Sequence, residues 1–173
     1  MSDFFATART SKVFVQVRAL TEAGWISGML LKASNRRVAD TLNTGGDKLT
    51  LTNAFVPGGD ADVPFMTVRR DKILLVMLDE REGKRPVSGV YAAVTERHVI
   101  CLAGFATLVG TVDVPKNLRV SDYLGSERGF VEFRQVQLTV RNPYSGEQWT
   151  RKVDHLLLNS HQIVAVSEQE DDE

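Results

Sequence analysis

Short stretches in which apolar and polar residues alternate make up most of the chain. Between residues 13 and 19, valine or alanine at the odd positions alternates with Phe14, Gln16 and Arg18 at the even positions. This period of two is typical of a β-strand with one buried face. Clusters of glycine, asparagine and proline separate such stretches and indicate turns. The pattern predicts strands at residues 13–19, 25–31, 48–56, 65–69, 73–78, 97–103, 106–114, 130–141, 148–158 and 163–166.

A stretch of seven residues occurs twice. It reads RVADTLN from Arg37 to Asn43 and RVSDYLG from Arg119 to Gly125, with 82 residues between the two starts. Apolar, glycine and turn positions keep the same order around both copies, and the second copy becomes longer near the turn at residues 142–146. This repetition favours an internal duplication. The alternative is a chance alignment of two β-rich stretches.

Spacing within the repeated stretch predicts a short helix that plugs the end of a small β-domain. The apolar positions four residues apart fall on one helix face: Val38 with Leu42, and Val120 with Leu124. The charged positions three residues apart allow a local ion pair: Arg37 with Asp40, and Arg119 with Asp122. The stretch ends in Asn43 or Gly125, which tolerate the left-handed conformation that often ends a helix. We interpret it as structural, and a binding or catalytic Arg–Asp pair is the alternative.

The length of 173 residues and the repeat favour two small domains of about 70 residues each. Five short strands and one helix in each copy predict a mainly β fold of two tandem small β-barrels or bent-sheet domains, similar in look to Sm-like and OB-like barrels. The predicted boundaries are a flexible N-terminal arm at 1–12, a first β-domain at 13–78, a linker at 79–96, a second β-domain at 97–166 and a disordered acidic tail at 167–173.

Charge and composition exclude several classes of partner. The 21 basic and 22 acidic residues give a net charge of −1, so no global field attracts nucleic acid or an anionic membrane. No stretch approaches the roughly 18 apolar residues that a membrane span needs, and the start lacks the features of a secretory signal. A single cysteine, Cys101, fits a reducing compartment. We therefore expect a cytoplasmic protein without membrane insertion.

The usual catalytic patterns are missing from the sequence. His98, His155 and His161 lack the spacing of a zinc-protease motif, although His155, His161 and one carboxylate form a conceivable metal site. Cys101 lies in an apolar run, which indicates a small buried hydrophobe rather than a nucleophile. No nucleophile elbow, P-loop or dinucleotide-binding turn occurs. We expect no enzymatic activity, no cofactor and no metal.

Two pairs of residues are candidates for binding. Phe4 and Phe5, on the N-terminal arm, would anchor the arm either to a neighbouring surface or to the protein's own body. Arg69 and Arg70 lie between the last two strands of the first copy, where loops of Sm-like barrels contact RNA. Nucleic-acid binding is therefore the alternative function. The near-zero net charge and the few aromatic residues near the basic positions weigh against it.

The Arg-Val-x-Asp-x-Leu-Asn motif at residues 37–43, the following residues 49–54 and the strand from Ile73 together resemble a small bacterial domain family without an assigned function. The resemblance covers residues 13–78 and, more weakly, 97–166, where Gly125 replaces the asparagine. It supports a duplication and implies no activity.

The predicted open edge strands at residues 65–68 and 148–158 would allow sheets to pair edge to edge. We therefore expect a non-enzymatic interaction module, an adaptor or structural subunit of a protein assembly. Self-association or a stable protein partner follows from this expectation.

Overall fold

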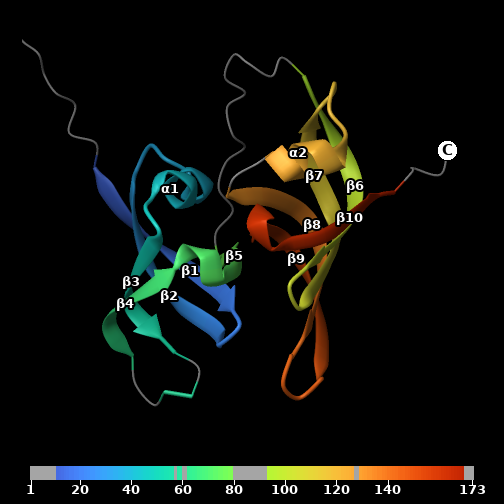
Figure 1. Cartoon of the computed structure of the whole chain (residues 1–173). Coiled ribbons are helices and arrows are strands. Elements are labelled where there is room, and N and C mark those ends of the chain that lie inside the picture. The colour runs from blue at the N-terminus through green and yellow to red at the C-terminus, as the bar shows by residue number, and fades with distance from the viewer. Residues whose placement is uncertain (1–10, 57, 60–61, 80–92, 127–128, 170–173) are drawn as a thin grey trace, which may run out of the picture.

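The computed structural model describes residues 11–56, 58–59, 62–79, 93–126 and 129–169 (Figure 1). The first half of the chain forms β1 (Lys12–Thr21), β2 (Gly24–Ala33), α1 (Val38–Thr44), β3 (Lys48–Phe55), β4 (Val63–Arg69), the 3₁₀ turn η1 (Arg70–Lys72) and β5 (Ile73–Leu78). The second half forms β6 (Val94–Ala103), β7 (Ala106–Pro115), α2 (Val120–Ser126), β8 (Phe130–Arg141), β9 (Gln148–Asn159), the 3₁₀ turn η2 (Ser160–Gln162) and β10 (Ile163–Glu168). The order of elements in the second half repeats that of the first.

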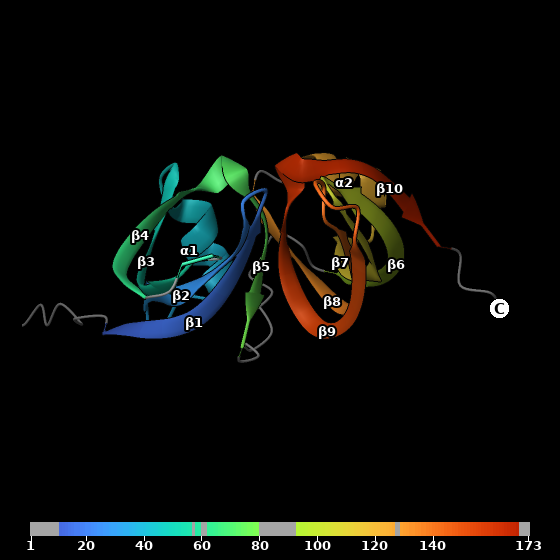
Figure 2. The same ribbon diagram turned by 90° about the horizontal axis from the view of Figure 1, so that it is seen from below.

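All ten strands belong to one antiparallel sheet with the order β10-β6-β7-β8-β9-β5-β1-β2-β3-β4. The mainly β class is confirmed, but the two halves are not separate barrels, because β5 and β9 pair and join them into one open sheet (Figure 2). Alternation of apolar and polar residues predicts strands but does not say which strand edges meet, so this junction escaped the sequence prediction.

Each half bends its part of the sheet at a β-bulge in the same place. The register shifts between β2 and β3 and between β7 and β8. Asn53 and Gln135, which lie 82 residues apart, have positive φ angles of 47° and 49° at these bulges. The facing strands carry Gly28 and Gly110, and a Cβ on Gly110 would lie 2.9 Å from the carbonyl oxygen of Arg134. The bulges bring two backbones close together and curve the sheet.

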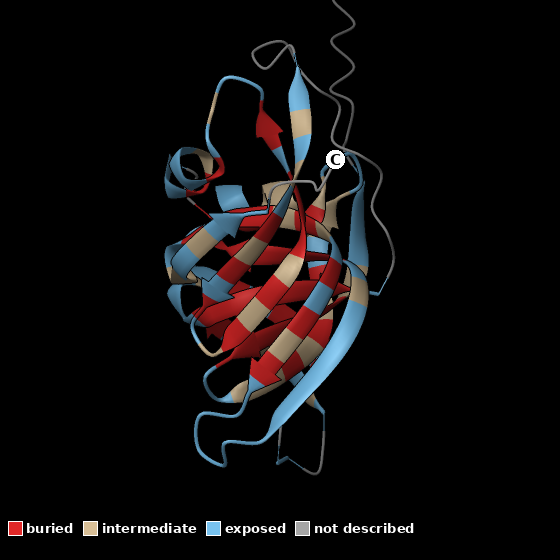
Figure 3. Cartoon of the chain, turned by 90° about the vertical axis from the view of Figure 1, so that its right-hand side faces the viewer, coloured by how far each residue is buried: buried red, intermediate tan, exposed pale blue. Residues whose placement is uncertain are grey.

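Two hydrophobic cores lie on opposite faces of the sheet, and β5 contributes to both. Ile73, Val76 and Leu78 join the core of the first half. Leu74, Leu75 and Met77 join the core of the second half. Buried bands alternate with exposed ones on many strands (Figure 3), whereas all six residues of β5 are buried. The sheet therefore curves one way in the first half and the other way in the second, with β5 and β9 between the cores.

The two short helices bury the apolar pairs of the repeated stretch, Val38 with Leu42 and Val120 with Leu124. Neither Asn43 nor Gly125 ends its helix in a left-handed conformation, contrary to the sequence interpretation, because α1 continues to Thr44 and α2 to Ser126. In the first half, the Asn43 side chain instead contacts another strand, as described below.

Some predicted boundaries move by a few residues. Strand β6 begins at Val94, inside the predicted linker, and β10 ends at Glu168, inside the predicted tail. Phe4 and Phe5 and most of the predicted linker lie outside the described residues. Among the residues that the structure describes, neither helix has the length or hydropathy of a membrane span.

Candidate functional site

The two strands at the ends of the sheet, β4 and β10, are the candidate site. Each has a paired neighbour on one side only within the described part of the chain, β3 for β4 and β6 for β10. Each also exposes a large apolar side chain: Phe65 of β4 is 70% exposed and Val164 of β10 is 76% exposed. Unpaired N–H and C=O groups beside exposed apolar side chains form a template that another strand can pair with.

The junction between the halves shows what such edges look like when they are paired. In the repeated order of elements, β9 takes the place of β4, and β5 takes the place of β10. Three residue pairs join them: Leu75 with Leu158, Val76 with Leu157, and Met77 with Leu156. Leu74, which corresponds to Val164, is only 3% exposed, and His155, which corresponds to Phe65, is 8% exposed.

Two residues of the repeated stretch also hold the junction together. The Asn43 carboxamide accepts a hydrogen bond from the Phe130 N–H at 2.6 Å and donates one to the Phe130 carbonyl at 2.9 Å. Arg37 forms an ion pair with Glu132 at 2.6 Å. The predicted ion pair with Asp40 is replaced by a contact from the Arg37 backbone N–H to the Asp40 carboxylate at 3.4 Å. The motif therefore links α1 to β8, a role that the sequence interpretation missed because the partners lie far away in the chain.

The end of β9 and the η2 turn add side-chain contacts from the second half to the end of the first. The Asn159 side chain donates hydrogen bonds to the carbonyl oxygens of Ile73 at 2.9 Å and Arg70 at 3.3 Å. Gln162 donates to the carbonyl oxygen of Asp71 at 2.8 Å. Amide side chains thus take the place of backbone partners where the β5–β9 ladder ends.

Arg69 and Arg70, the candidates for nucleic-acid binding, both have partners within the chain. Arg69 donates two hydrogen bonds, a bidentate contact, to the Asp71 carboxylate at 3.0 and 2.7 Å. Hydrogen bonding from Arg69 lowers the pKa of Asp71. Arg70 donates to the carbonyl oxygens of Gly45 and Gly46 in the α1–β3 loop. A nucleic acid would have to compete with these contacts.

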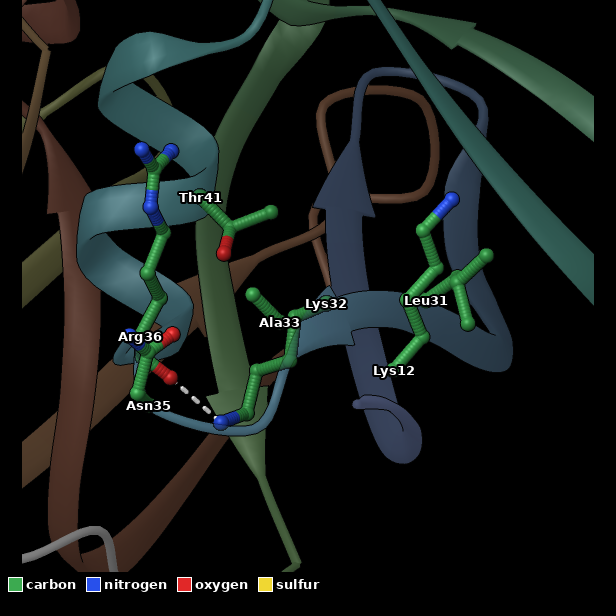
Figure 4. Close-up of a pocket in the computed structure, with 7 residues that line it drawn as sticks. All are labelled: Lys12, Leu31, Lys32, Ala33, Asn35, Arg36 and Thr41. Carbon is green, nitrogen blue, oxygen red and sulfur yellow. Dashed lines mark hydrogen bonds between the residues drawn. The ribbon is translucent and has the colours of Figure 1, made fainter. Parts of the chain in front are cut away.

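A shallow hollow beside α1 collects three cationic residues, Lys12, Lys32 and Arg36, and no acidic residue lines it. Lys32 donates a hydrogen bond to the Arg36 carbonyl. Figure 4 shows that the three charged ends lie at separate places around the hollow and do not converge on one point. The hollow therefore lacks the geometry of a compact phosphate site.

A second hollow lies where the long β8–β9 hairpin approaches the first half. The ring centroids of Trp25 and Trp149 are 6.1 Å apart with an interplanar angle of 38°. Arg18, Met77 and Arg151 complete the lining. Arg18 forms an ion pair with Asp79 at 2.7 Å. The tryptophan pair adds a further contact between the two halves.

The described residues contain no metal-binding cluster and no exposed thiol. No three of their histidine, cysteine, aspartate and glutamate side chains gather where a metal ion would bind. Cys101 is fully buried, and burial raises its pKa to about 12. The buried Nε2 atom of His155 has no hydrogen-bond partner among these residues. The buried thiol of Cys101 is therefore a poor nucleophile at neutral pH.

Comparisons of the chain with protein-family models, with curated proteins and with solved structures give no match. Of the predicted binding residues, Arg69 and Arg70 lie together at the end of β4, whereas Phe4 and Phe5 fall outside the described residues.

Proposed function

We propose that this protein is a non-enzymatic interaction module, a structural subunit of a protein assembly, that binds its partner through the free edges β4 and β10. The observation that supports this proposal is the contrast between paired and unpaired edges in one molecule. At the paired β5–β9 junction Leu74 and His155 are buried, whereas the corresponding residues of the unpaired edges, Val164 and Phe65, are exposed to solvent. Covering them with another strand would pair backbone groups and remove apolar surface from water.

The small-barrel character expected from the sequence belongs to the same proposal. Each half curls around its own core, and its helix covers part of that core. A curved five-stranded unit with an open edge is suited to assembly side by side with other such units.

Site-specific photo-cross-linking tests the proposal. A benzophenone amino acid replaces Phe65 or Val164 in cells that produce the protein, and Tyr144 serves as the matched control. Tyr144 is an exposed aromatic residue in the β8–β9 turn, away from both edges. We expect discrete protein adducts from the two edge positions and none from the control. The absence of edge adducts, or equal adducts at all three positions, would contradict the proposal.

Nucleic-acid binding is the second candidate, and the hollow with Lys12, Lys32 and Arg36 is the observation that favours it. Binding there would be salt-dependent, because it would rest on contacts with phosphate groups. The test is the ratio of absorbance at 260 and 280 nm for protein purified without nuclease, compared between the wild type and the Lys12→Ala/Arg36→Ala variant. Nucleic acid that co-purifies only with the wild type would support this function.

A further inference from the structure

We infer that the partner of these edges is a second copy of this chain, and that β4 of one molecule pairs with β10 of the next in a head-to-tail arrangement. This inference rests on the proposed function, because it names the partner of the same two edges. It assigns an antiparallel register in which Val68 faces Ala165, Thr67 faces Val166, and Met66 faces Ser167.

The register comes from the junction that already exists inside the chain. Ninety positions separate corresponding residues at this end of the repeat, so η1 at residues 70–72 corresponds to η2 at residues 160–162. Leu158, Leu157 and Leu156 of β9 then correspond to Val68, Thr67 and Met66 of β4. Leu75, Val76 and Met77 of β5 correspond to Ala165, Val166 and Ser167 of β10. The internal junction thus shows an edge of the β4 type paired with an edge of the β10 type. Among the residues that the structure describes, one further edge of each type has no second strand beside it.

Nothing in the corresponding stretch of the free edges blocks the pairing. Pro64, which cannot donate a ladder hydrogen bond, lies outside the three positions of β4 that would pair. Those three positions carry no charged side chain, and neither do their partners on β10. The three paired positions of each edge strand therefore lack the charges and prolines with which many edge strands prevent association.

The contact between molecules would be weaker than the internal junction. Smaller or more polar residues replace several of the internal leucines. Gly125 occupies the position that corresponds to Asn43, so it cannot form the hydrogen bonds that Asn43 forms with Phe130. Thr50 occupies the position that corresponds to Glu132, so Arg119 would lack the acidic partner that Arg37 has. We expect reversible association that increases with protein concentration.

The arrangement is heterologous, because the two surfaces that meet are different. Such contacts close into a ring or extend as a filament, whereas a two-fold contact would stop at a dimer. This difference provides the test.

The experiment combines two charge substitutions with light scattering of purified full-length protein over a range of concentrations. Phe65→Asp impairs the β4 edge, and Val164→Asp impairs the β10 edge. Both side chains are exposed in the single molecule, so the fold should tolerate the changes. Each variant alone should associate about tenfold or more weakly than the wild type. The new carboxylate would lie directly beside the paired stretch, at the position where His155 or Leu74 is buried in the internal junction.

Mixing the two variants gives the decisive result. The Val164→Asp molecule retains an intact β4, and the Phe65→Asp molecule retains an intact β10. Together they should form a one-to-one dimer and nothing larger. Tyr144→Asp, at the exposed hairpin turn, should associate like the wild type. Circular dichroism confirms folding, and Ala165→Asp, at an exposed position of β10, is the second variant if Val164→Asp fails to fold.

The other outcomes separate this inference from the proposed function. Single variants that still form dimers, or a mixture that stays monomeric while the wild type associates, would overturn the head-to-tail pairing and leave the edges as self-association sites of another kind. A wild type that remains monomeric at every concentration would overturn self-pairing, whereas edge adducts with a different protein in the cross-linking experiment would still support the proposed function.

Discussion

At the scale of single residues, the Asn43 carboxamide behaves like an extra piece of strand. It satisfies both the N–H and the C=O of Phe130, at the first position of β8. The neighbouring Gly129 has a φ of +141°, and a Cβ there would lie 2.2 Å from the Asn43 side-chain oxygen. Glycine is therefore required at position 129 both by the backbone conformation and by the close approach of the Asn43 side chain.

Asn43→Ala should lower the free energy of unfolding by about 1 kcal/mol, because two hydrogen bonds are lost at a partly exposed site. Urea denaturation followed by circular dichroism measures the change. Asn117→Ala, at an exposed asparagine before α2, is the matched control and should change stability little. Equal effects of the two substitutions would show that the hydrogen bonds between Asn43 and Phe130 contribute nothing to the free energy of unfolding.

Cys101 should resist thiol reagents while the protein is folded, because it is buried and its pKa is raised to about 12. The thiol of the unfolded chain releases this proton at its ordinary pKa of 9.0, while burial in the folded protein raises the pKa to about 12. Raising the pH through this window therefore favours unfolding.

Denaturation of the wild type and of Cys101→Ala at several alkaline pH values measures this contribution. The wild type should lose more stability than the variant between pH 9.0 and about 12. Rapid labelling of Cys101 at neutral pH, without unfolding, would contradict the assigned burial.

At the scale of elements, the bulge on β8 opposite Gly110 sets the curvature of the second half. Gly110→Ala should destabilise the protein by about 1–3 kcal/mol, because the new methyl group would meet the backbone of Arg134 and the Val136 side chain. Thermal unfolding compares it with Gly46→Ala, where a Cβ has no neighbour within 4 Å. A loss no greater than that of the control would mean that the two strands can move apart at the bulge.

Much of the secondary structure could be predicted from the sequence, because alternation and turn clusters are local signals. The apolar pairs of both helices followed from their four-residue spacing in the same way. The pairing that joins the two halves could not be predicted, because no local sequence pattern in β5 or β9 identifies the strand with which it pairs. One signal was present in the uninterrupted apolar run from Ile73 to Leu78, which is typical of a strand buried on both faces. The corresponding strand β10 ends in Ser167 and Glu168 and is exposed along one edge.

Arg37 and Asn43 show the same limit at the candidate site. Local spacing suggested an ion pair and a helix end, whereas their partners, Glu132 and Phe130, lie 95 and 87 residues away. Contacts across such distances depend on the pairing of strands in the whole fold. The function of the motif became visible only when the sheet order was known.

At the scale of the whole molecule, the placement of β5 between two cores makes the halves depend on each other. Removing the second half would expose Leu74, Leu75 and Met77, which pack in the second core. The full chain should therefore unfold in one cooperative transition, with agreement between calorimetric and van't Hoff enthalpies.

Residues 1–79 produced alone should aggregate or lack cooperative unfolding, since an edge and an apolar face of β5 would be exposed. Calorimetry of the full chain and of this fragment checks the prediction. Two separate transitions in the full chain, each matching an isolated half, would contradict it.

The β5–β9 junction also restricts the number of five-stranded halves that an assembly of this chain can contain. Because the junction lies within one chain, its formation does not depend on protein concentration, whereas β4–β10 pairing does. Five-stranded units would therefore be added two at a time. A closed ring made only of this chain would contain an even number of units, with permanent and reversible junctions alternating around it, and dilution would open every second junction.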